Sequence, residues 1–141
     1  MDKTLNPYHI AITKIPTLGN RTIRQLMDIC PDAEELFSMS HAQLKEIFKN
    51  HTRPIEAFES KAGLKQAEEE VKQLEKYGIE TLFFTQENYP QRLNQNGCED
   101  TPVLLYKLGS CDLNPDRSIA MVGARKCTDY GYTVANRIIQ E

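Results

Sequence analysis

The sequence lacks the features that membrane and secreted proteins require. No apolar run approaches the ~20 residues that a membrane-spanning helix needs. The first residues, Met1-Asp2-Lys3-Thr4-Leu5-Asn6, are not those of a signal peptide. With 141 residues, 40% of them hydrophobic and 26% charged, the chain has the composition of a soluble globular protein of one ordinary or two small domains. We therefore expect a cytoplasmic protein with no membrane partner.

The sequence also lacks the cysteine and histidine patterns of metal sites. No two of its four cysteines form a C-x-x-C pair, and its histidines do not cluster with them: Cys30, Cys98, Cys111, Cys127, His9, His41 and His51. We expect reduced thiols, no metal site and no cofactor. Cys127 follows Lys126, but a catalytic cysteine needs a basic partner and no histidine lies near it in the sequence.

Excess positive charge is missing as well. The formal net charge is -3, and residues 54–117 hold twelve Asp or Glu against seven Lys or Arg. Proteins that bind nucleic acid over a broad surface usually carry a basic footprint. A nucleic-acid partner would therefore have to use a local basic patch of this chain.

The most informative stretch is residues 118–141. An apolar run ends in Gly123, a polar loop follows, and apolar residues then recur at helical spacing, which predicts strand, loop and helix. Gly123 would allow a sharp turn, the coming helix would offer free N–H groups, and Arg125 and Lys126 would add positive charge. The loop lacks the G-x-G-x-x-G motif of dinucleotide-binding proteins. The alternative to a phosphate-binding site is therefore that Arg125 is only a solvated charge on the loop.

Three motifs resemble those of the DprA/Smf family of bacterial DNA-processing proteins. They follow one another in the family's order over residues 60–141: Asn88-Tyr89-Pro90-x-x-Leu93, then Thr101-Pro102-Val103-Leu104-Leu105-Tyr106 with Gly109, then Val122-Gly123-Ala124-Arg125-Lys126 with Thr128 and Tyr130-Gly131. The resemblance implies an α+β/α/β chain. A helical sterile-alpha-motif-like or helix-hairpin-helix domain is expected over residues 1–62, and the first part of a Rossmann-like DNA-binding domain over residues 63–141.

The resemblance also implies a function. The family binds single-stranded DNA, protects it during natural transformation and loads RecA on it, without acting as an enzyme. Position by position, Gly123, Ala124 and Arg125 match its phosphate-contacting loop, and Lys126 adjoins them. The other pocket residues and the dimer and RecA surfaces are expected beyond this chain. We therefore expect weak DNA binding by these 141 residues, and possible pairing of two copies through an incomplete sheet.

The first helices are predicted from local signals. Asn6-Pro7 opens a helix, and residues 15–29 look like the turn and second helix of a helix-hairpin-helix, with Gly19 in the turn. Gly19, Arg21 and Arg24 are the candidate contacts to duplex DNA. The alternative is a hairpin that only packs a small helical domain.

Later signals predict more helices, then strands. Helices are expected from Pro31-Asp32, from the capping box Ser40-x-x-Gln43, and over residues 52–77 with a phase slip at Gly63, where we place the domain boundary. Residues 81–85 and 103–106 are predicted as buried strands. Tyr89, in the connection between them, would either stack on a base or pack under the loop.

Two other functions stay open. A phosphoribohydrolase-like enzyme would hold a nucleotide 5′-phosphate with the arginine, but it needs carboxylates at the sugar, and Asp129 is the sole acid of the loop. A duplex-DNA module would act through the hairpin at residues 17–21. Removing Arg125 distinguishes the three functions. It should weaken single-strand binding if the loop binds single-stranded DNA, abolish turnover if the protein is an enzyme, and leave duplex binding intact if the hairpin binds duplex DNA.

Overall fold

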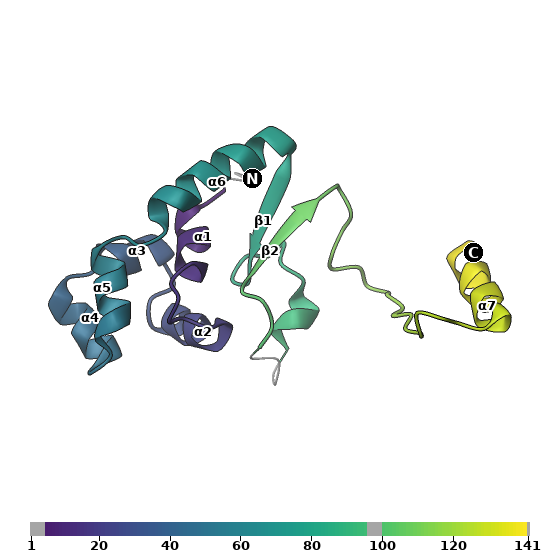
Figure 1. The fold of residues 1–141 in the computed structure, drawn as a ribbon, viewed down its shortest axis with the longest axis horizontal. Coiled ribbons are helices and arrows are strands. Elements are labelled where there is room, and N and C mark those ends of the chain that lie inside the picture. Colours follow the sequence, from purple (N-terminus) through teal and green to yellow (C-terminus); the bar gives the residue numbers. More distant parts are fainter. Residues whose placement is uncertain (1–4, 96–99, 141) are drawn as a thin grey trace.

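The computed structural model describes residues 5–95 and 100–140. Six helices come first (Figure 1), then two strands and a last helix: α1 (Pro7–Thr13), α2 (Asn20–Ile29), α3 (Ala33–Ser38), α4 (His41–Phe48), α5 (Thr52–Glu59), α6 (Leu64–Tyr77), β1 (Ile79–Phe83), β2 (Leu104–Leu108) and α7 (Asp129–Gln140). Cys98 lies outside the described residues. The fold is of the α+β class, and no helix within the described ranges is long and apolar enough to cross a membrane.

The predicted helix starts are confirmed by their caps. The side chains of Asn6 and Asp32 each accept a hydrogen bond from a backbone N–H in the first turn of α1 and α3. Ser40 and Gln43 make both bonds of the capping box at α4. Such bonds satisfy N–H groups that have no acceptor inside the helix, and each contributes about 1 kcal/mol.

Two glycines set the ends of α6. Gly63 precedes it with φ 78°, and Gly78 follows it with φ 63°, so both backbones are left-handed. A Cβ at Gly63 would lie 3.0 Å from the Cβ of Lys14. The phase slip predicted here is therefore a real break between α5 and α6, and glycine is needed both for its backbone angle and for its close approach to α1.

One apolar core joins the helices to the sheet. Ile10, Ala11 and Ile12 of α1 are fully buried at its centre. The ring of Phe58 lies between those of Phe37 and Phe48, with centroid distances of 5.0 and 5.7 Å. The same cluster of buried residues continues through α6 to β1 and the residue before β2. The core therefore crosses the position after residue 62 at which the sequence analysis divides the chain.

His9 lies where α1 meets β1. Its ring stacks on that of Phe83, with centroids 4.0 Å apart and planes 5° apart. Its Nδ1 is buried and has no hydrogen-bond partner among the described residues. Burial disfavours the charged imidazolium and lowers the pKa of His9 from 6.5 to about 4.

We expect His9 to make folding sensitive to acid. Its pKa is lower in the folded chain than in the unfolded one, so the unfolded chain binds the extra proton as the pH falls below 6.5. Stability should decrease by about 2 kcal/mol between pH 7 and pH 5 through this residue alone. Urea unfolding at both pH values would measure it. His9→Gln should remove that part of the slope, whereas His51→Gln, at an exposed position, should keep it.

The two strands form an antiparallel pair. Ile79 lies opposite Leu108, and Phe83 lies opposite Leu104. The strands overlap the predicted ranges with shifted bounds. β1 is buried as expected at Leu82 and Phe83, but Tyr106, inside the second predicted range, is 50% exposed. The prediction of full burial is wrong for β2, in which Tyr106 is half-exposed and donates a hydrogen bond from its hydroxyl to Glu70 of α6 at 2.6 Å.

The strand predicted over residues 118–123 does not form. Ile119 is 84% and Val122 is 94% exposed, and the sheet of the described residues consists of β1 and β2. A strand obtains its backbone hydrogen bonds from a neighbouring strand, and this segment has none. The prediction of α7 is confirmed, but α7 lies apart from the rest of the chain (Figure 1) and buries none of its residues.

Candidate nucleic-acid interface

The predicted phosphate loop lies on the open segment between β2 and α7. Gly123, Ala124, Arg125 and Lys126 are all exposed, and the backbone bends at the two basic residues. Gly123 does not have a positive φ, and no atom lies within 4 Å of the position of an added Cβ. The sharp turn expected of Gly123 is absent because the strand that would enter it is absent. The loop therefore offers two accessible cations rather than a closed cradle.

Thr128 shapes the start of α7. Its hydroxyl accepts a hydrogen bond from the Gly131 N–H at 3.2 Å, and its carbonyl accepts one from the Tyr132 N–H at 2.9 Å. Asp129 places a carboxylate in the first turn. One of the N–H groups expected to attract an anion is thus already bonded. The negative charge of the carboxylate also offsets the partial positive charge at this end of the helix. Attraction for a phosphate at this end depends on Arg125 and Lys126.

Arg92 anchors the segment that leads to this loop. Its guanidinium donates hydrogen bonds to the carbonyl oxygens of Pro115 at 3.0 Å and Asp116 at 3.5 Å, and to the hydroxyl of Ser118. These contacts tie residues 115–118 to the short 3-10 helix η1 (Gln91–Asn94). Arg92 lies inside one of the three motifs, at a position that the motif leaves open, so the sequence did not indicate its role.

The structure places Arg24, a predicted DNA contact, against the long β1–β2 connection. Its guanidinium donates to Asn94 Oδ1 at 3.0 Å and to the Thr101 hydroxyl at 2.8 Å. It also lies over the ring of Phe84, 4.5 Å from the centroid. The Nε atom is buried without a hydrogen-bond partner in the part of the chain described. Arg24 thus joins α2 to the connection, an internal role that its sequence position did not indicate.

The turn before α2 differs from the expected hairpin. Gly19 has φ -85°, so its conformational freedom is not used, and it is the N-cap of α2 without a side-chain bond. Asn20 accepts from the Val103 N–H at 3.3 Å and donates to the Asp100 carbonyl at 3.4 Å. Of the two arginines predicted here, Arg21 is the exposed one.

Tyr89 packs under the long connection, as one of the two predictions for it states. Its side chain is fully buried, and its hydroxyl donates a hydrogen bond to the Pro102 carbonyl. Burial raises the pKa of this phenol. A ring with no exposed face cannot stack on a base, so the stacking hypothesis is wrong for this structure.

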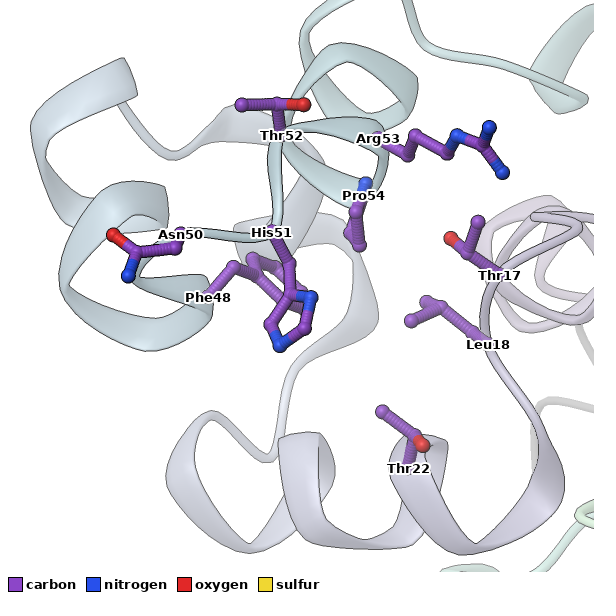
Figure 2. A pocket seen from close by; sticks show the side chains of 9 residues that line it. All are labelled: Thr17, Leu18, Thr22, Phe48, Asn50, His51, Thr52, Arg53 and Pro54. Atoms are coloured by element: carbon purple, nitrogen blue, oxygen red, sulfur yellow. The ribbon is translucent and has the colours of Figure 1, made fainter.

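A groove lies between the turn before α2 and the start of α5 (Figure 2). It has a volume of about 540 Å³. Polar side chains that line it come from both sides, namely Thr17 and Thr22 from one and His51 and Arg53 from the other. No sequence pattern indicates this groove, because its two sides are more than 25 positions apart and only the fold brings them together.

The comparisons with known proteins add a family. Residues 80–141 match the model of a family described as DNA recombination-mediator protein A. Over these residues the chain is similar to the DprA/Smf family. The searches of curated proteins and of solved structures gave no match. The match to the DprA/Smf family spans β1, the long connection, the exposed loop and α7, so it covers all three motifs from which the resemblance was drawn.

The family that residues 80–141 match is described by a role in DNA recombination. The described residues hold no group of three His, Cys, Asp or Glu side chains able to bind a metal. Asp129, the acid that a nucleotide-cleaving enzyme would need in the loop, lies in the first turn of α7, where a carboxylate stabilises the helix.

Proposed function

We propose that this protein binds single-stranded DNA through the exposed loop Gly123-Ala124-Arg125-Lys126. The observation that carries the proposal is the family match, which includes this loop. The exposure of all four residues supports it, because a polyanion can approach both cations without displacing a packed side chain. We further propose that the loop acts in DNA protection and in loading a recombinase of the RecA class, through binding and not catalysis.

The proposed contacts are to phosphate. The guanidinium of Arg125 has a planar fork of donors that matches two phosphate oxygens, while Lys126 adds a point charge. Contacts of this kind carry little sequence information, so binding should be non-specific and should weaken with salt. The net charge of -3 and the small number of cations at the loop predict low affinity.

The domain division and the Rossmann-like arrangement belong to the same proposal. Residues 118–123 have the composition of a buried strand but lack a partner strand among the described residues. Pairing of this segment, in a second copy or with further strands, would place Gly123 at a strand end and bring the loop to the edge of a sheet. Ligands of open α/β sheets bind at such an edge.

The test is fluorescence anisotropy of labelled oligo-dT titrated with the chain at low and moderate salt. Arg125→Gln should raise the Kd about five- to tenfold at low salt, since it removes a charge-assisted phosphate contact. It should also reduce the slope of log K against log salt by about 0.7, the value for one phosphate on a single strand.

Lys72→Gln is the matched control for this titration. It removes the same charge from an exposed position on α6 and should change the Kd by less than twofold. Equal effects of the two variants would show that net charge alone governs binding. The phosphate role of the loop would then be rejected.

A further inference from the structure

We propose that the groove between the turn before α2 and the start of α5 binds a phosphate group. This site shares no residue with the loop at Gly123 to Lys126 and does not depend on it. The proposal rests on the chemistry of the groove's lining, on its volume and on the way in which α5 begins.

The lining is that of an anion site. Nine described residues line the groove, and none of them is Asp or Glu. Arg53 supplies a guanidinium, and Thr17 and Thr22 supply hydroxyls that donate to phosphate oxygens. Figure 2 shows the Arg53 side chain extending from the start of α5 in the direction of Thr17, so donors from two separate segments border the same space.

The apolar part of the groove gives it a fixed shape. Leu18, Phe48 and Pro54 line it, and all three are buried. The volume of about 540 Å³ lies within the range of about 300–1,000 Å³ found for small-molecule pockets. A phosphate with an attached sugar or base therefore fits the groove, as does a phosphate of a nucleic-acid backbone at its open side.

The start of α5 adds backbone donors. His51 is its N-cap but makes no side-chain capping bond. Pro54 has no N–H, so the first-turn donors of this eight-residue helix come from Thr52 and Arg53, both of which line the groove. The helix dipole favours negative charge at the same place. Side-chain and backbone donors thus line one groove, and no Asp or Glu side chain lines it.

The experiment is a ¹H–¹⁵N correlation NMR titration of the whole chain with sodium phosphate, against sodium chloride at matched ionic strength. We expect saturable shifts of the amides of Thr17, Leu18, Thr22, Thr52 and Arg53 with phosphate and not with chloride. Arg53→Gln should raise the Kd about tenfold, since the guanidinium makes the charge-assisted contact. Lys65→Gln, an equal loss of charge on exposed α6, should leave it within twofold.

Shifts that are equal in chloride, or an Arg53→Gln variant that binds phosphate like the parent, would overturn the proposal. Two further arms identify the source of the phosphate. Thymidine 5′-monophosphate binding as tightly as an oligo-dT indicates a free nucleotide, whereas tighter binding of the oligonucleotide indicates a DNA backbone. In Arg125→Gln the phosphate shifts at the groove should be unchanged. A failure of the loop and a failure of the groove are therefore told apart.

Discussion

Replacing Tyr89 by alanine is expected to destabilise the chain by about 3–5 kcal/mol, the usual cost of truncating a buried aromatic side chain. Tyr89 is fully buried, and its ring fills the space beneath the connection between β1 and β2. Its hydroxyl holds the Pro102 carbonyl, next to the start of β2. Losing the ring leaves a cavity and frees this carbonyl at once. Urea unfolding followed by circular dichroism measures the change.

Two variants separate the contributions of Tyr89. Tyr89→Phe keeps the ring and should cost about 1 kcal/mol, the net value of one hydrogen bond. Tyr77→Ala removes a tyrosine that is 65% exposed at the end of α6 and should cost less than about 1 kcal/mol. If Tyr89→Ala left stability unchanged and reduced oligo-dT binding, the ring would be a base-stacking residue.

Replacing Arg24 by alanine should cost about 3 kcal/mol. The change removes charge-assisted hydrogen bonds to Asn94 and Thr101, and also the contact with the Phe84 ring. Asn94 and Thr101 would each lose a donor while remaining half-buried. Arg24 is not fully satisfied, since its Nε is buried without a partner, and this lowers its net contribution. Unfolding in urea gives the value.

The Arg24 experiment also tests the duplex-DNA hypothesis for the turn before α2. Arg24→Lys keeps the charge but loses the planar fork, so it should recover only part of the stability. Gln25→Ala, at the adjacent exposed position, should be nearly neutral. Duplex binding, if measurable, should not depend on Arg24 in protein that remains folded. An unchanged stability with lost duplex binding would instead assign Arg24 to DNA.

Much of the helical half could be predicted from the sequence because its signals are local. A helix start needs a side chain that reaches an N–H two or three positions ahead, as Asn6, Asp32 and Ser40 do. The ends of α6 need glycines with positive φ, which Gly63 and Gly78 provide. Helix caps and helix ends depend on residues a few positions apart, so they can be predicted from the local sequence alone.

The candidate site was harder to predict because its parts depend on distant partners. Gly123 and Gly19 were both expected in special turns, and neither has a positive φ. The segment 118–123 has strand composition, yet a strand requires the N–H and C=O groups of another strand beside it. The phosphate groove needs residues 17–22 and 48–54 to meet, and no local pattern indicates that meeting.

The sequence by itself determined the helices, their caps, the α+β composition and the motifs of the DprA/Smf family, because all of these are recorded in residue type and short spacing. Only the tertiary structure decided which polar and aromatic side chains face the interior. Arg24, Tyr89 and His9 lie on segments whose patterns allow either exposure or burial. Tyr89 is fully buried, and Arg24 and His9 are partly buried. A partner elsewhere along the chain lies against each of them: Pro102 against Tyr89, Thr101 against Arg24 and Phe83 against His9.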